Sequence, residues 1–146
     1  MRRIIKLLAV LALVAAPVAR AEAQDAYRVI VNAANPASQI SKSELARIFM
    51  KKRTTWESGS PVEVVDQTER SQARAQFSST VLGKDVATMK SYWQQSLFSG
   101  RGVPPVEKSS DTQVAQFVAG NDAAIGYVST AVPLPAGVKV LEVSSR

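Results

Sequence analysis

The sequence contains no cysteine and no histidine among its 146 residues. Without cysteine the chain can form neither disulfide bonds nor thiolate metal sites, and it has no cysteine nucleophile. Without histidine it lacks the usual general base of serine hydrolases and the commonest ligand of zinc and copper. These absences exclude most hydrolase chemistry. The sequence therefore favours a binding protein without catalytic residues, metal or cofactor over an enzyme.

The longest apolar run, residues 7–18, is shorter than the roughly 20 residues that a membrane-spanning helix needs. Three basic residues precede it, and small-x-small sequences follow it, ending at Ala21 and at Ala23. This order is typical of a secretory signal peptide. We expect residues 1–21 to be the signal peptide, with cleavage after Ala21 or, alternatively, after Ala23. The mature protein is then expected in the periplasm.

The net charge of +6 comes from 18 basic and 12 acidic residues. Arg2, Arg3, Lys6 and Arg20 leave with the predicted signal peptide, and removing these four charges reduces the net charge to +2. The basic character of the chain is thus largely a property of the signal peptide. Together with the predicted export, it gives no reason to expect a nucleic-acid partner.

The remaining sequence predicts one domain, residues 27–144, in which strands and helices alternate. Apolar periodicity, capping residues and glycine stops predict the following elements: strands at 27–31, 62–65, 124–128 and 138–143, and helices at 41–50, from 68–71 to 82, at 85–100 and at 110–120. This order predicts an α/β fold with a central sheet flanked by helices. Gly126, inside a predicted strand, indicates either a close approach of another backbone segment or a β-bulge.

A basic run, Lys51 to Arg53, follows the first predicted helix. One interpretation is that these cations interact with the carboxyl end of the helix, where the helix dipole favours positive charge. The other is a patch for an acidic partner. The sequence favours the first interpretation, because basic residues are common at this position of helices.

The stretch from Val64 to Arg74 contains the candidate binding site. A strand is followed by a polar loop and then by a helix, whose first N–H groups have no acceptor within the helix. Such a helix start can bind an oxyanion. Thr68 and Ser71 add hydroxyl donors, and Arg70 and Arg74 add charge and paired donors. We predict an oxyanion site formed by these four residues.

Two plainer interpretations of this stretch remain open. Thr68 or Ser71 caps the helix while the arginines face solvent, and Glu69 itself interacts with the helix dipole in place of an anion. Asp66 and Glu69 could also act as acid and base or bind a cation. Neither a nucleophile nor further cation ligands lie near them in the sequence. We therefore expect no catalytic role for these carboxylates.

A series of motifs between about Val29 and Ala131 resembles a known family. In order, the motifs are Leu45-x-x-Ile48-Phe49, Trp56, Pro61-Val62, Glu69-Arg70-Ser71, Phe77, Tyr92-Trp93, Phe98-Ser99-Gly100 and Ala124-Ile125-Gly126-Tyr127-Val128. They resemble the phosphate-binding periplasmic components of ABC transporters, and more closely the short, single-lobe members of that family. The resemblance implies a type II periplasmic-binding-protein fold, of which this chain supplies one lobe.

The resemblance also implies a role for Ser71. In full-length relatives, phosphate lies between two lobes, and one lobe contributes a loop of the type Arg-Ser-Asp-Gly-Ser-Gly-Thr at a helix start. Aligned through Phe77, Ser71 falls on the phosphate-binding serine of that loop. The flanking glycines are replaced by Arg70 and Gln72, the threonine is Ala73, and Asp66 or Gln67 stands where the arginine would be.

One lobe can supply only part of the donors that a dehydrated phosphate needs. A second copy of the chain in a homodimer, or another protein, would then have to complete the site. The sequence accordingly supports two hypotheses. The first is a periplasmic protein that binds phosphate or a similar oxyanion. The second is a ligand-free accessory module for an envelope transporter, sensor or receptor.

Overall fold

The computed structural model describes residues 26–146, so the predicted signal peptide lies outside the described residues. The described chain folds into strands and helices in the following order: β1 (Tyr27–Asn32), β2 (Gln39–Ser41), α1 (Lys42–Phe49), β3 (Glu63–Gln67), α2 (Gln72–Phe77), a π-helical turn η1 (Ser78–Leu82), α3 (Val86–Phe98), β4 (Val106–Lys108), α4 (Asp111–Ala119), β5 (Ala124–Ser129), β6 (Val138–Val140) and β7 (Glu142–Ser144). Between Ala26 and Arg146, no helix has the length and apolar character that crossing a bilayer would demand.

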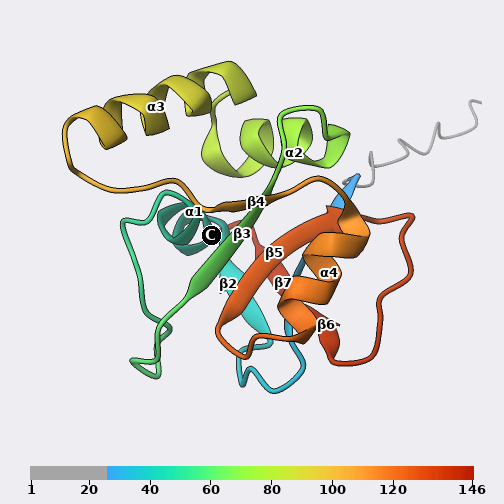
Figure 1. Cartoon of the computed structure of the whole chain (residues 1–146). Coiled ribbons are helices and arrows are strands. Elements are labelled where there is room, and N and C mark those ends of the chain that lie inside the picture. The colour runs from blue at the N-terminus through green and yellow to red at the C-terminus, as the bar shows by residue number, and fades with distance from the viewer. Residues whose placement is uncertain (1–25) are drawn as a thin grey trace, which may run out of the picture.

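A five-stranded mixed sheet forms the centre of the domain, with strand order β4-β3-β5-β1-β6. Strand β3 runs parallel to both of its neighbours, β4 and β5, whereas β1 is antiparallel to β5 and β6. A separate pair of short parallel strands, β2 and β7, lies beside it. Helix α4 crosses in front of β5 in Figure 1, while α2 and α3 lie together beyond the upper end of the sheet.

Two apolar cores cover the two faces of the sheet. One contains four aromatic rings, those of Tyr27, Phe49, Phe77 and Tyr127. Further apolar side chains of α1, α2 and η1 pack around these rings. The other is aliphatic and is formed mainly by α4 with β3 and β5. Strand β5 separates them, and its first five residues are all buried. A run buried on both faces needs no polar alternation, which is why the sequence 124–128 is continuously apolar.

Gly126 lies where β5 pairs with β3 and packs against α4. A Cβ atom at this position would stand 2.7 Å from Val65 Cγ1 and 2.9 Å from Val114 Cγ1. Both distances are shorter than the contact distance of carbon atoms, so only glycine lets the two side chains meet over the strand. The predicted close approach at Gly126 is therefore confirmed.

The predicted fold class, an α/β domain with a central sheet flanked by helices, is confirmed. The prediction missed β2 and β4, which have three residues each and are too short for a periodic signal. It also merged β6 and β7 into one strand. Leu141 divides them: its side chain is buried, and its N–H donates to the Val29 carbonyl at 2.9 Å, after which the chain leaves β1 and pairs with β2.

The predicted second helix is confirmed, with its start at Gln72 and Ser71 as its cap. It continues as η1 and ends at Gly83, whose φ of +65° favours glycine. Helix α3 buries Met89 and Trp93, as its apolar spacing predicts. Leu97 continues the same apolar spacing, four residues after Trp93, but is 50% exposed.

Candidate functional site

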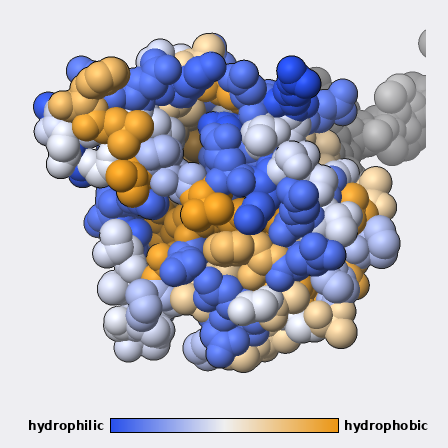
Figure 2. Space-filling model, viewed as in Figure 1, coloured by the Kyte–Doolittle hydropathy of each residue, from blue (hydrophilic) through white to orange (hydrophobic). Residues whose placement is uncertain are grey.

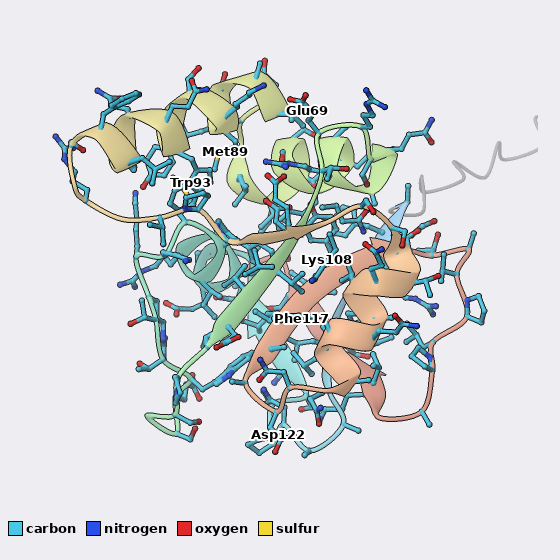
Figure 3. All side chains as sticks on the ribbon, in the orientation of Figure 1. Glu69, Met89, Trp93, Lys108, Phe117 and Asp122 are labelled. Atoms are coloured by element: carbon cyan, nitrogen blue, oxygen red, sulfur yellow. The ribbon has the colours of Figure 1, made fainter. Side chains whose placement is uncertain are left out.

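A groove with a volume of about 580 Å³ lies between α3, the start of α2 and strand β4. We call it the α3 groove. Its walls are residues 68–70 and Arg74, the side of α3 that carries Lys90 and Trp93, and Pro104, Glu107 and Ser109. Figure 3 shows Met89 and Trp93 on the side of α3 that faces the rest of the domain. The groove opens at the carboxyl end of β3, where α/β proteins commonly bind ligands.

The structure brings three of the four predicted site residues to this groove. Thr68, Arg70 and Arg74 line it, whereas Ser71 is not among its lining residues. Arg70 is exposed at the mouth. The backbone N–H of Thr68 donates to the Lys108 carbonyl at 3.1 Å, which holds the loop against β4. The oxyanion role of these residues stays a prediction.

Ser71 uses its hydroxyl inside the domain. Its Oγ accepts a hydrogen bond from the Arg74 N–H at 3.1 Å, as a helix cap does. The same hydroxyl donates to Gln67 Oε1 at 2.6 Å. Because a serine hydroxyl carries one proton, a ligand could receive that proton only if the bond to Gln67 broke. The capping interpretation of Ser71 is thus confirmed.

Arg74 is the central side chain of the site. It is only 5% exposed, so the interpretation that both arginines face solvent is wrong for Arg74. Its Nη1 donates to the Gln67 carbonyl and, at 2.8 Å, to Glu107 Oε1, while Nη2 lies 3.6 Å from Asp66 Oδ2. Its Nε has no hydrogen-bond partner among the described residues. This nitrogen is itself shielded from solvent, so an acceptor from outside could reach it only if neighbouring side chains moved.

The charges around Arg74 hold one another in place. Burial raises the pKa of Asp66 above its ordinary value, although Arg74 and the Tyr127 hydroxyl act in the opposite direction. Burial by itself would lower the pKa of Arg74, but Asp66 and Glu107 outweigh it and raise that pKa, so the guanidinium stays charged. Burial and the neighbouring Asp66 also raise the pKa of Tyr127, whose hydroxyl donates to Asp66 Oδ1.

Gln67 connects the site to the rest of the fold, and sequence reasoning assigned it no contact there. Its Nε2 donates to Asp111 Oδ1 at 2.7 Å and to the Tyr127 carbonyl at 2.9 Å, and its Oε1 accepts from Ser71. One amide thus joins β3 to α2, α4 and β5. The available signal was a polar pair, Asp66-Gln67, directly after two buried valines, since polar residues at buried positions need internal partners.

The two carboxylates that were considered as an acid–base or cation pair interact with separate partners. Asp66 is buried against Arg74 and Tyr127, whereas Glu69 is exposed and lies 3.2 Å from Lys90 Nζ. Within residues 26–146 no group of three or more potential metal-ligating side chains comes together. The groove brings together three cationic side chains that can donate hydrogen bonds, namely Arg70, Arg74 and Lys90.

Comparison with solved structures identifies binding proteins that contain the same fold. The chain superimposes on a protein from Clostridium perfringens described as a phosphate ABC transporter substrate-binding protein with bound phosphate, with a TM-score of 0.65 and 22% identity over 82% of this chain and 45% of that one. An ABC-type phosphate transport receptor from Vibrio cholerae gives a TM-score of 0.63 at 20% identity, covering 82% of this chain and 46% of the receptor. PstS from Borrelia burgdorferi gives 0.63 at 16% identity, covering 84% and 49%.

At these identities the likeness establishes the fold, and the chain spans less than half the length of these relatives. No curated protein sequence matches the chain significantly. A family model described as a PBP superfamily domain matches residues 17–142, most of the chain. The motifs, the sheet topology and this match agree, and the chain belongs to the PBP superfamily.

Proposed function

We propose that this protein is a non-catalytic periplasmic solute-binding protein whose single lobe binds phosphate, or a similar oxyanion, in the α3 groove. The buried guanidinium of Arg74 carries the proposal. It lines the groove, stays charged, and retains an unpartnered Nε donor. Charged donors in partly dehydrated surroundings are the groups that bind oxyanions most strongly in proteins. The phosphate named for the Clostridium perfringens neighbour supports this choice of ligand.

The remaining charges determine how strong this binding can be. Asp66 and Glu107 offset the charge of Arg74, and Glu69 offsets that of Lys90, so Arg70 supplies the free positive charge. The groove is also much larger than one phosphate ion. We expect the isolated protein to bind phosphate with a Kd on the order of a millimolar, about 4 kcal/mol. A membrane transporter partner, or a second copy of the chain, would complete the donor shell.

The two tryptophans allow a site-specific test. Trp93 lines the α3 groove and Trp56 lines a different cavity, so a Trp56→Phe variant reports the groove through the fluorescence of Trp93 alone. We expect phosphate to change this fluorescence saturably, and calorimetry to give the same Kd. Arg70→Gln should weaken binding roughly fivefold or more through the loss of one charged donor. Arg47→Gln, on the exposed face of α1, is the matched control and should leave the Kd unchanged.

A folded protein that gives neither heat nor a fluorescence change at millimolar phosphate would refute oxyanion binding. Sulfate at the same ionic strength separates phosphate specificity from a general oxyanion site. If sulfate binds with the same Kd as phosphate, the groove is a general oxyanion site and the proposal of phosphate as its specific ligand is wrong.

A second candidate function is a ligand-free accessory module for an envelope transporter, sensor or receptor. The contacts of Ser71 and Arg74 favour it, because the donors expected to bind the oxyanion are largely used inside the domain. This function predicts that a pull-down recovers one envelope protein and that Ser71→Ala and Arg70→Ala leave the complex unaffected. A complex that the wild type forms only when phosphate is present, and that Arg70→Ala abolishes, would favour the first function.

A further inference from the structure

The turn between α3 and β4 forms an apolar corner of the domain. We call residues 97–103 the α3 tip. Leu97 is 50% exposed, Phe98 is 94% exposed and Val103 is 58% exposed, which makes them three of the six large apolar side chains recorded as exposed in residues 26–146. In Figure 1 this turn lies at the outer left edge of the molecule, and Figure 2 shows apolar side chains gathered at the same corner.

The backbone of the α3 tip is held by its own hydrogen bonds. The Gly100 N–H donates to the Leu97 carbonyl at 3.2 Å, and the Arg101 N–H donates to the Ser96 carbonyl at 2.9 Å. Gly100 has a φ of +67°, the left-handed conformation with which many helices end. The exposure of Phe98 therefore belongs to an ordered helix end. Burying that ring would stabilise the chain, yet the folded domain leaves it in water.

The surroundings of the α3 tip are basic. Residues 86–106 contain no aspartate and no glutamate, and neither do residues 45–56. The two segments meet where Lys51 Nζ donates to the Pro104 carbonyl at 3.4 Å, so the end of α1 lies beside the tip. Lys52 and Arg101 are exposed. The basic run after α1, for which the sequence favoured a helix-dipole role over an acidic partner, thus borders the exposed apolar residues.

We propose that the α3 tip is a membrane-contact site that inserts Phe98, Leu97 and Val103 into the surface of an anionic phospholipid bilayer. Basic side chains are attracted to an anionic leaflet, and the apolar side chains add their burial at the headgroup boundary. The same basic surroundings disfavour a second copy of the chain as the occupant, because like charges would meet. A protein partner would need a cavity shaped for a projecting turn, whereas a fluid bilayer accommodates one.

Membrane contact at this corner leaves the mouth of the α3 groove next to the bilayer, since Leu97 and Pro104 also line the groove. A solute-binding protein held in this way would stay close to a membrane transporter. The contact itself does not depend on the proposed phosphate binding, because none of the three inserting side chains is one of its predicted donors.

A single reporter tryptophan tests the proposal in the full chain. Phe98→Trp, combined with Trp56→Phe and Trp93→Phe, leaves one indole at the tip, and the fluorescence of this indole is insensitive to binding through other segments. We call this triple variant the tip reporter. We expect brominated phosphatidylglycerol vesicles to quench it and vesicles of phosphatidylcholine to quench it much less. The matched reporter carries Val143→Trp in place of Phe98→Trp, at an exposed valine of β7, and should not be quenched.

Two further variants separate the apolar and the charged contributions. Val103→Ser should lower the vesicle affinity of the tip reporter roughly fivefold or more, and Val143→Ser should leave it unchanged. Lys52→Gln with Arg101→Gln should lower it roughly tenfold on anionic vesicles and remove its salt dependence. A tip reporter that stays unquenched at saturating vesicle concentrations would overturn the proposal. Binding to soluble polyglutamate but to no vesicle would also overturn it and indicate an acidic protein partner.

Discussion

Helices α2 and α3 border the same groove but are attached to the domain in different ways. Helix α2 continues into the aromatic core through Phe77 and buries Arg74 against β3 and β4. Helix α3, although about twice as long, buries only Met89 and Trp93, and η1 is the element with which it packs most. The wall of the groove that α2 forms is therefore part of the core, whereas the wall that α3 forms packs on the outside of the core.

This difference in attachment gives the two helices different roles: α2 holds a charged side chain of the site, and α3 carries the apolar tip. Arg74, the buried side chain that we propose to bind an oxyanion, needs a fixed position, and the ion pairs with Asp66 and Glu107 supply it. A helix with few buried residues opens locally at lower free energy than the core does. We therefore expect α3, which carries the exposed apolar tip at its end, to open at lower free energy than α2.

The largest expected effect comes from removing the anchor of α2. The Phe77 ring stacks on Tyr127 at 4.1 Å between ring centroids and also contacts Phe49 at 4.5 Å. We expect Phe77→Ala to lower the free energy of unfolding by about 3–5 kcal/mol, because it leaves a cavity in the aromatic core. Urea denaturation measures this change. A loss below about 1 kcal/mol would show that α2 is no better anchored than α3.

A smaller global effect is expected for the anchor of α3. Trp93→Ala also removes a buried aromatic side chain. The resulting loss in the free energy of unfolding cannot exceed the free energy with which α3 is attached to the domain, because beyond that point the helix detaches while the rest stays folded. We expect the unfolding free energy to fall by less than about 2 kcal/mol, while hydrogen exchange within residues 86–98 becomes much faster than in α2. Equal losses for Trp93→Ala and Phe77→Ala would contradict the comparison and place α3 in the same cooperative unit.

The smallest effect concerns the pH dependence of the network that fixes α2. Because the folded-state pKa of Asp66 lies above its ordinary value, the folded protein holds this proton more tightly than the unfolded chain. Stability is then lost as the pH rises from about 4 through the raised pKa, and Asp66→Asn removes this loss. The stability of Asp66→Asn relative to the wild type should therefore increase with pH.

Urea denaturation at a series of pH values from about 4 to 8 gives this difference. The matched variant Asp122→Asn changes an exposed carboxylate on the loop before β5, labelled in Figure 3, and reports the effect of losing one acidic side chain elsewhere. A difference for Asp66→Asn that stays flat or decreases as the pH rises would show that Arg74 stabilises the ionised carboxylate more than burial destabilises it.

The main elements of the fold could be predicted because their signals are local. Ser41, Asp85 and Ser110 each accept a backbone hydrogen bond at the helix starts that the sequence indicates, and Gly126 lies at the expected close approach. Strands β2 and β4 could not be predicted, because a three-residue strand is defined by its pairing partner. For the same reason, the last predicted strand is divided at Leu141, because there the chain stops pairing with β1 and starts pairing with β2.

The candidate site was predicted in part. The sequence indicated the loop between β3 and α2, and three of its four chosen residues line the α3 groove. It missed Gln67, Glu107 and Lys90, which come from β3, β4 and α3, and it gave Arg74 a solvent-facing alternative that burial excludes. Distances between side chains from four separate elements depend on how those elements pack, and local spacing does not contain that information.

By itself, the sequence determined the class of this protein: alternating apolar periods and caps specify an α/β domain, and the absence of cysteine and histidine removes whole families of chemistry. Tertiary structure alone decided how each polar group is used. Ser71 donates inward to Gln67, Arg74 lies between two carboxylates, and Phe98 projects from the corner. The physical reason is that backbone conformation responds to neighbours along the chain, whereas desolvation and hydrogen bonding respond to neighbours in space.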